Sequence, residues 1–389
     1  MAQKTHKILY IQYNNPAAFP PLEHSSRLLA DAGWQVLFLG IGAGSGAGEL
    51  RFPPRDRIKT RLMTSCRPGL RQKLHYLQFI LWATLWTLWW RPRWVYASDV
   101  LSAPAGVVLS LLPGVRVIYH EHDSPTGATP TSSFMRLCRA ARKWLAHRSA
   151  FSVLPNQQRA RRFAAEMGED NVFCVWNCPL REEVAAPRLA HDDSLWIVYH
   201  GSIVPPRLPP TVIEALAILP DNVKLRVIGY ETIGSPGYVT QLREMAGRLG
   251  IGDRVEFLGA LNMRSELLDW GRKSDIGLAF MPRNSDDVNM QHMTGASNKP
   301  FDYLACGAAL LVSDRPDWRQ LYVDSGYGLA CDPESPESIA GALRWFLDHP
   351  EEMRRMGEQG RQRVASEWCY ETQFAAVVKQ MNGKDNGQR

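Results

Sequence analysis

Short apolar segments rich in β-branched and aromatic residues alternate with helix-length segments, and this alternation constrains the fold more than any other feature. In the first half, the predicted strands are Lys7–Tyr13, Trp34–Leu39, Trp94–Ala97, Val115–His120, Ala150–Leu154 and Val172–Trp176. The predicted helices are Leu22–Ala32, Leu70–Trp90, Leu101–Leu112, Ser133–Arg148 and Gln157–Met167. Nearly continuous apolar strands separated by helices indicate a parallel sheet covered on both faces. The first half is therefore predicted to be a doubly wound α/β domain.

A second alternation begins at residue 195. Its predicted strands are Leu195–His200, Lys224–Ile228, Arg254–Leu258, Ile276–Phe280, Ala309–Val312 and Gly328–Ala330. Its predicted helices are Pro210–Leu219, Val239–Leu249, Ser265–Lys273, Pro300–Ala305, Pro316–Val323, Ser338–Leu347, Pro350–Trp368 and Glu371–Met381. We expect two doubly wound domains, 1–180 and 195–368, joined by a linker at 181–194. Because open α/β sheets bind ligands at the carboxyl ends of their strands, the cleft between the domains is the expected binding site.

Charge is divided unevenly between the two halves of the chain. Residues 1–190 contain 24 Lys and Arg against 12 Asp and Glu, a balance of +12, whereas the remaining 21 basic and 27 acidic residues give −6. Such an asymmetry indicates an anionic partner for the basic half, either a membrane surface, a phosphorylated substrate or nucleic acid, unless this face is merely solvated. Nucleic acid is disfavoured because no recognition motif with interleaved aromatic residues is present.

Compartment and membrane topology are constrained by three features. The apolar run after Lys7 ends at Gln12, which is too short for the core of a signal peptide. The longest apolar stretch, Phe79 to Trp90, has twelve residues against the ~20 that span a bilayer. Seven widely spaced cysteines form no disulfide framework and favour a reducing compartment. We therefore expect a cytoplasmic protein without a transmembrane helix.

Two segments of the second half have the pattern of an anion site. Gly201 closes a predicted strand and precedes a predicted helix, so a ligand can approach its backbone closely, and Arg207 can reach a phosphate there. Lys299 stands at the start of the other predicted helix, where positive charge is disfavoured unless it meets an anion. Asp302, about one turn later, can accept two hydroxyl hydrogen bonds, as a ribose would supply.

The string Asn298-Lys299-x-Phe301-Asp302-Tyr303-Leu304-Ala305-x-Gly307, followed by a strand and Ser313-Asp314, resembles the donor-site signature of GT-B glycosyltransferases. Within these it resembles the retaining family-4-like group, the glycosyl transferases group 1. The segment Trp368–Met381 resembles the last helix of that group, which would return as residues 369–389 to the N-terminal domain. The resemblance implies two Rossmann-like domains facing a cleft, with the acceptor on the N-terminal domain and a nucleotide-sugar on the C-terminal one.

The resemblance also assigns residues to the donor. Gly201 and Ser202 match the loop that approaches the diphosphate, although the family usually has Arg where Ser202 stands. Arg207 and Lys299 would be the cations on the diphosphate, and they replace a metal or other cofactor. Asp302, with Tyr303 beside it, matches the second Glu of the Glu-x7-Glu pattern. The first Glu falls at position 294, where this chain has Thr294, which leaves open whether activity is reduced or donor choice is changed.

A group of ionisable residues, Tyr119-His120-Glu121-His122-Asp123, ends a strand of the first domain. Open α/β sheets bind ligands at this edge. The resemblance places a functional histidine here that reaches the donor sugar, and His122 and His120 are the candidates. Two His and two carboxylates are also zinc-type ligands, but no third ligand cluster accompanies them, so no metal site is expected.

The segment Leu74–Trp94 is rich in tryptophan and flanked by arginines such as Arg71 and Arg91. A buried helix explains its apolar residues, and so does a helix at an anionic membrane surface. We expect the chain to transfer a sugar, with retention, from a nucleotide-diphosphate-sugar to a lipid-linked or polysaccharide acceptor, peripherally at the inner face of the plasma membrane. The alternatives are transfer to a soluble small-molecule acceptor and a non-catalytic nucleotide-sugar-binding scaffold.

Overall fold

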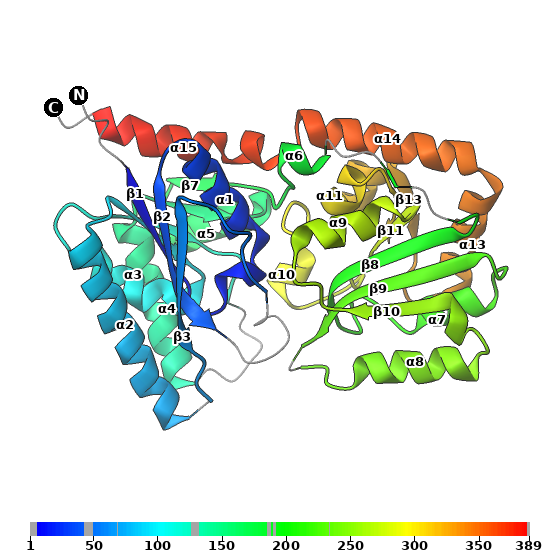
Figure 1. Cartoon of the computed structure of the whole chain (residues 1–389), viewed down its shortest axis with the longest axis horizontal. Helices are drawn as coiled ribbons and strands as arrows, with labels where there is room; N and C mark the ends of the chain where they lie inside the picture. Colours follow the sequence, from blue (N-terminus) through cyan, green and yellow to red (C-terminus); the bar gives the residue numbers. More distant parts are fainter. Residues whose placement is uncertain are drawn as a thin grey trace. The chain divides into compact units, whose positions relative to one another are not determined.

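The computed structural model describes residues 6–42, 50–67, 69–125, 132–184, 188–189, 192–232 and 234–386. The chain divides into two compact units, each built around one parallel sheet (Figure 1). Unit 1 comprises Met1–Asn177, Asp286–Ala296 and Gln373–Arg389, and unit 2 comprises Cys178–Ser285 and Ser297–Thr372. All seven cysteines lie in the described part, and none of them forms a disulfide there.

Unit 1 has a seven-stranded parallel sheet in the order β3-β2-β1-β4-β5-β6-β7. Its strands are β1 Lys7–Ile11, β2 Gln35–Gly42, β3 Ile58–Thr64, β4 Trp94–Ser98, β5 Arg116–His120, β6 Phe151–Leu154 and β7 Val172–Cys174. Its helices are α1 Pro20–Asp31, α2 Leu70–Trp90, α3 Ala103–Ser110, α4 Ser133–Arg148, α5 Gln157–Met167 and α10 Val288–Gln291, and most of α15 Tyr370–Asn386 belongs to this unit. The strand order reverses between β1 and β4, which makes their carboxyl ends the natural place for a ligand.

Unit 2 has a six-stranded parallel sheet in the order β10-β9-β8-β11-β12-β13. Its strands are β8 Leu195–Ile203, β9 Val223–Glu231, β10 Val255–Gly259, β11 Ile276–Ala279, β12 Ala309–Ser313 and β13 Gly328–Cys331. Its helices are α6 Arg181–Val184, α7 Thr211–Ala217, α8 Tyr238–Arg248, α9 Arg264–Arg272, α11 Lys299–Ala305, α12 Pro316–Trp318, α13 Pro336–Asp348 and α14 Pro350–Ser366. Here the order reverses between β8 and β11.

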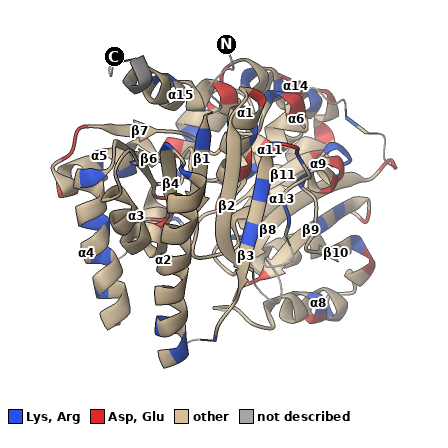
Figure 2. Ribbon diagram, turned by 60° about the vertical axis from the view of Figure 1, so that its left-hand side comes forward, with Lys and Arg blue, Asp and Glu red and all other residues tan. Residues whose placement is uncertain are grey.

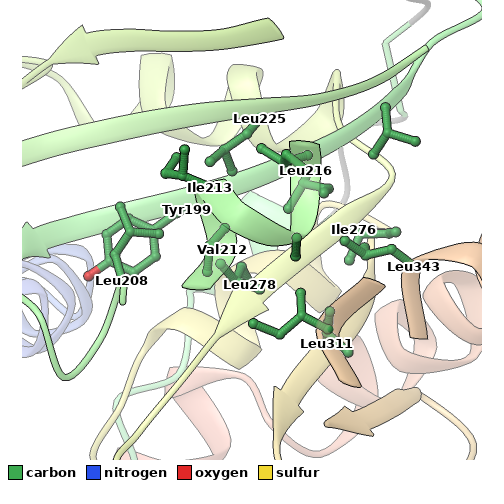
Figure 3. Packing of buried hydrophobic residues seen from close by; sticks show 14 of the residues in the cluster. Tyr199, Leu208, Val212, Ile213, Leu216, Leu225, Ile276, Leu278, Leu311 and Leu343 are labelled. Atoms are coloured by element: carbon green, nitrogen blue, oxygen red, sulfur yellow. The ribbon is translucent and has the colours of Figure 1, made fainter. Parts of the chain in front are cut away.

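The core of unit 2 shows why the strands have almost continuously apolar sequences. Leu225 from β9, Leu278 from β11 and Leu311 from β12 pack with residues of α7 and α13 in one buried cluster (Figure 3). Burying a leucine in this way stabilises the fold by about 1.5–3 kcal/mol. The prediction of an α/β fold with two doubly wound sheets is confirmed.

Two segments differ from the sequence prediction. Strand β3 was not predicted, because it is a mostly exposed edge strand whose polar residues hide the apolar pattern of a buried strand. Residues 286–296, expected within the C-terminal domain, group with unit 1. The Asn289 side-chain amide accepts from the Ser124 backbone N–H at 2.8 Å and donates to the Ser124 carbonyl at 2.9 Å, and the Asn156 amide donates to the Thr294 carbonyl at 2.6 Å. These contacts hold the segment on unit 1.

Candidate functional site

At the carboxyl end of β8, the backbone lies very close to Lys299 and to the adjacent strand β9. Gly201 has φ +107°, and a Cβ built on it would lie 3.2 Å from the Lys299 Nζ. A Cβ on Gly229, in the adjacent β9, would lie 1.8 Å from the Gly201 carbonyl oxygen. Glycine is required at both positions because only a backbone without side chains can pass here. The predicted loop at Gly201 therefore lies directly against Lys299.

Lys299 begins α11 and is 4% exposed. Its Nζ lies 5.6 Å from the centre of the Tyr199 ring, and among the described residues it has no hydrogen-bond or ion-pair partner. Burial, and next the positive charge of Arg207, lower the pKa of Lys299 to about 7, while Asp302 acts in the opposite direction. A buried amine with unused donors beside a second cation is the kind of group that an anionic ligand stabilises.

Arg207 and Ser202 complete this cation cluster. The Arg207 Nη1 donates to the Ser202 Oγ at 3.2 Å, and its buried Nε has no hydrogen-bond partner within the described part of the chain. Gly201, Ser202, Arg207 and Lys299 are therefore brought together, as the sequence predicted. Their arrangement offers two cations and a close backbone to a diphosphate.

Asp302 lies within a buried ion-pair network. It is 1% exposed, and its carboxylate accepts from Arg264 at 2.5 and 3.2 Å and from the Asn298 amide at 2.7 Å. His200 Nε2 lies 3.4 Å from the same carboxylate, and Arg264 also pairs with Glu183 at 2.7 Å. Both oxygens of Asp302 thus already have protein partners, and its predicted role with ribose stays a prediction.

The sequence analysis missed Arg264, although a signal for it existed. Arg264 is the first residue of α9, and a cation at a helix N-terminus is unfavourable unless an anion lies nearby. The same argument drew attention to Lys299. Applied to every helix, it would have marked Arg264 as a residue with a buried acidic partner.

Tyr303 packs against His200, the residue that precedes Gly201 in β8. Its hydroxyl accepts from the backbone N–H of His200 at 3.0 Å, and the ring packs edge-on against the His200 ring. A Cβ on Gly277 of β11 would lie 2.1 Å from the Tyr303 ring, so the ring lies flat on that strand. Tyr303 was predicted to contact the donor, and in the structure it is a buried residue that positions the end of β8.

The candidate histidines of unit 1 lie at the carboxyl end of β5 with their ring centres 3.9 Å apart. His122 Nε2 is hydrogen-bonded to Ser98 Oγ at 2.9 Å, and His120 Nδ1 to the Tyr96 hydroxyl at 2.8 Å. Burial lowers the pKa of His122 to about 4 and that of His120 well below its usual value, so both are neutral at pH 7. His122 is 7% exposed and His120 is fully buried, which makes His122 the better placed of the two to touch a ligand.

Asp99 is a further polar residue that the sequence analysis missed. It follows β4 with φ +64°, a left-handed conformation that is rare for residues other than glycine. Its carboxylate accepts from the His122 backbone N–H at 2.9 Å and from the Gln12 amide at 3.3 Å, and burial raises its pKa to about 6. Asp99 directly follows a buried strand, and His122 also lies just after one. This position was the signal by which the sequence analysis could have found Asp99. Among the described residues no three His, Cys, Asp or Glu side chains come together to hold a metal ion.

Two family models cover most of the chain. The model of the glycosyl transferases group 1 matches residues 181–363, and that of the glycosyl transferase 4-like domain matches residues 22–175. The chain is a group 1 glycosyltransferase with the GT-B fold. The family prediction made from the residues around Lys299 is thereby confirmed.

Comparison with individual proteins agrees with this family. The glycosyltransferase is 23% identical to the glycogen synthase of Mycobacterium tuberculosis over 308 residues, which are 77% of this chain and 71% of that protein. Sucrose-phosphate synthase from Thermosynechococcus elongatus has a similar structure, with a TM-score of 0.74, 14% identity and coverage of 98% and 100% of the two chains. HepE from Anabaena, solved in complex with UDP and glucose, gives a TM-score of 0.70, 15% identity and coverage of 97% and 100%.

Proposed function

We propose that this glycosyltransferase transfers a sugar, with retention, from a nucleoside-diphosphate-sugar to a lipid-linked or polysaccharide acceptor. The observation that carries the proposal is Lys299: a buried amine without a partner in the described structure, beside Arg207 and the Gly201 backbone. The donor diphosphate would occupy this cluster. The HepE structure, which contains UDP, supports a nucleotide donor for this fold.

In the proposed reaction, the bond between the anomeric carbon and the diphosphate oxygen breaks as the acceptor hydroxyl oxygen bonds to the same carbon. Arg207 and Lys299 stabilise the negative charge that develops on the leaving diphosphate. In this proposal the two side chains do so without a metal or a cofactor. The acceptor proton passes to the departing phosphate oxygen on the same face of the sugar, which accounts for retention. His122 is the proposed contact to the donor sugar.

Nucleotide binding tests the proposal directly. Thermal unfolding would be followed with UDP, GDP, ADP and their glucose derivatives, for the wild type and for Lys299→Ala. A ligand at 100 times its Kd stabilises the folded chain by about 2.7 kcal/mol. We expect one nucleotide to raise Tm in the wild type and in Lys224→Ala, a surface-lysine control, and to have little effect on Lys299→Ala.

Two other results would change the proposal. If no nucleotide shifts the Tm of the folded wild type, the donor site is misassigned. If a nucleotide-sugar binds but neither its transfer nor its hydrolysis is detected, the non-catalytic scaffold is favoured, for which Thr294 in place of the usual Glu is the motivating observation.

The pH dependence of nucleotide binding follows from the lowered pKa of Lys299. The free amine loses its proton above about pH 7, whereas a bound diphosphate favours the charged form, so binding takes up a proton above that pH. If only the charged form binds, Kd is expected to rise about fivefold from pH 7 to 8 and about tenfold more to pH 9, and to be constant below pH 6. Calorimetric titration across this range measures the change in Kd, and Lys224→Ala, which should keep the wild-type profile, is the control.

The outward face of α2 supports a membrane location for the acceptor. Tyr76, Phe79, Ala83 and Thr87 pack inward, while a stripe of leucines, each more than half exposed, faces outward. The stripe comprises Leu70, Leu74, Leu77, Leu81, Leu85 and Leu88. Of the tryptophans stressed in the sequence analysis, Trp94 is fully buried in β4, whereas Trp89 is largely exposed on α2, one turn after Leu85.

Basic residues lie at the start of this leucine stripe and on a nearby helix of the same unit. Arg71 and Lys73 are exposed at the start of α2, and α3 separates α2 from α4, which carries Lys and Arg along its length (Figure 2). Among the described residues, no helix has the length and apolar character needed to span a bilayer. An apolar stripe with cations at one end is complementary to an anionic leaflet, and from this complementarity we propose that α2 lies on the surface of a membrane that presents the acceptor.

Membrane binding is expected to depend on the leucine stripe. Leu77→Glu/Leu81→Glu should weaken binding to vesicles of phosphatidylcholine with 30 mol% phosphatidylglycerol by about a hundredfold, because each buried leucine contributes about 1.5–3 kcal/mol. Co-sedimentation measures this, with Leu249→Glu, at an exposed leucine of unit 2, as the control. Equal binding of the double variant and the wild type, or no dependence on anionic lipid, would leave the soluble acceptor as the better proposal.

A further inference from the structure

Unit 1 contains a cavity of about 100 Å³ beside α4 and α5. Its charged lining residues are Arg142, Arg159, Arg162 and Glu166. Three arginines face one carboxylate, so the cavity has an excess of positive charge. This cavity belongs neither to the cation cluster at Lys299 nor to the leucine stripe of α2.

Arg142 is already neutralised by protein groups. Its guanidinium forms two hydrogen bonds with Glu121, one of them 2.9 Å long between Nη2 and Oε1, and a third of 3.0 Å with Glu166. Glu166, the acidic residue among the described residues of the lining, is therefore also paired. The charge that remains for a ligand comes from Arg159 and Arg162.

Arg159 is a buried cation whose donors are only partly used. It is 1% exposed, its Nη2 donates to the His122 carbonyl at 2.5 Å, and its Nε and Nη1 have no hydrogen-bond partner among the described residues. Burial lowers the pKa of Arg159, while the negative charges of Asp123, Glu121, Asp99 and Asp287 act in the opposite direction. Buried donors without acceptors are unfavourable, so their presence beside a cavity points to an acceptor that enters it.

The position of Arg159 in the chain is also unusual. It lies in the first turn of α5, where a positive charge is disfavoured by the helix dipole. At two other helix starts with a largely buried cation, Lys299 has the features of an anion site and Arg264 binds buried carboxylates. Arg162, one turn further along α5, is exposed and lines the same cavity.

The size of the cavity limits the ligand. Sites for drug-sized molecules have about 300 Å³ or more, so a cavity of about 100 Å³ accepts a small group and excludes a nucleotide. A phosphoryl group has enough oxygens to accept from both free N–H groups of Arg159 and from Arg162. We propose that this cavity binds a phosphoryl group of the acceptor, with Arg159 and Arg162 as its ligands. The proposal rests on the proposed function, since Arg159 also holds the backbone of His122, the proposed sugar contact.

Binding of inorganic phosphate tests the site, and neighbouring arginines provide a matched pair. Arg161 and Arg162 are both exposed on α5, but only Arg162 lines the cavity. Phosphate would be titrated at constant ionic strength into Lys299→Ala, which weakens competing binding at the donor site, and into the same variant with Arg162→Gln or Arg161→Gln. We expect Arg162→Gln to weaken phosphate binding about tenfold and Arg161→Gln to leave it unchanged.

Two further binding measurements identify the source of the phosphoryl group. Glycerol 3-phosphate represents a soluble ester, and phosphatidylcholine vesicles with 20 mol% phosphatidic acid represent a lipid. The source of the phosphoryl group is the probe whose binding is weakened more by Arg162→Gln than by Arg161→Gln. Arg159→Gln should abolish phosphate binding. If that variant does not fold, comparison of Arg162→Gln with Arg161→Gln still tests whether phosphate binds in the cavity. Equal effects of the paired variants, or no phosphate binding in Lys299→Ala, would overturn the proposal. A failure of the donor assignment would appear separately, as the absence of a nucleotide-dependent Tm shift in the wild type.

Discussion

Replacing Lys299 with alanine is expected to lower kcat for donor turnover by about 10²–10³-fold, because a buried charge aimed at a developing anion is among the strongest catalytic contributions of a single side chain. Lys299 lies against the Gly201 backbone and beside Arg207, so in the proposed complex it meets the diphosphate as it leaves. The loss should persist at saturating donor, since a charge that develops in the transition state is what the amine stabilises.

The measurement is the release of nucleoside diphosphate from the nucleotide-sugar that raises Tm most in the binding screen, without an added acceptor. Arg207→Ala should lower the same rate, and the double variant should lose less than the product of the single effects, because both cations act on one group. Lys224→Ala is the control for loss of a surface lysine. A kcat for Lys299→Ala within about threefold of the wild-type value would contradict the catalytic role.

Replacing Arg264 with methionine is expected to destabilise unit 2 by about 3–5 kcal/mol, the usual cost of removing one partner from a buried ion pair. The change leaves the carboxylates of Asp302 and Glu183 without their shared cation, and Asp302 is 1% exposed. Water cannot replace the guanidinium there without opening the structure. Urea unfolding, followed by fluorescence, measures the loss.

Two further variants separate this explanation from a general effect of losing an arginine. Arg355→Met removes an exposed i,i+3 pair with Glu352 and should change stability by less than about 1 kcal/mol. Adding Asp302→Asn to Arg264→Met should recover part of the loss, because it removes one of the two unpaired charges. An Arg264→Met protein as stable as the wild type would show that Arg264 does not hold this network.

This network also connects stability to the donor site. Asn298 donates to the Asp302 carboxylate and directly precedes α11, whose first residue is Lys299. The same carboxylate lies 3.4 Å from the His200 ring, next to Gly201. Asp302 therefore holds the start of α11 and the end of β8 in place, and we infer that Arg264 acts on donor binding as a positioning residue.

The sequence was sufficient where local pattern and burial coincide. Buried parallel strands must be apolar along their length, so most strands of both sheets were predicted, and helices α2, α4 and α5 were predicted with their observed bounds. The string around Lys299 was also decisive, because a cation at a helix start, a carboxylate one turn later and a glycine stop are local features of one segment. The resemblance of this string to a known donor-site signature identified the family, and the segment Gly201–Arg207 supplied the rest of the cation cluster.

Only the tertiary structure decided which groups are already paired and which face a helix turns outward. Only the structure shows that both oxygens of Asp302 already have protein partners, among them Arg264, which is distant in the chain. Leu77 and Phe79 are both apolar residues of α2, yet packing against the sheet buries Phe79 and leaves Leu77 exposed. Arg159 is one of several arginines in a basic segment, and only the fold shows that it is buried with unused donors. Local sequence sets the propensity and period of each element, whereas pairing and burial depend on contacts between residues far apart in the chain.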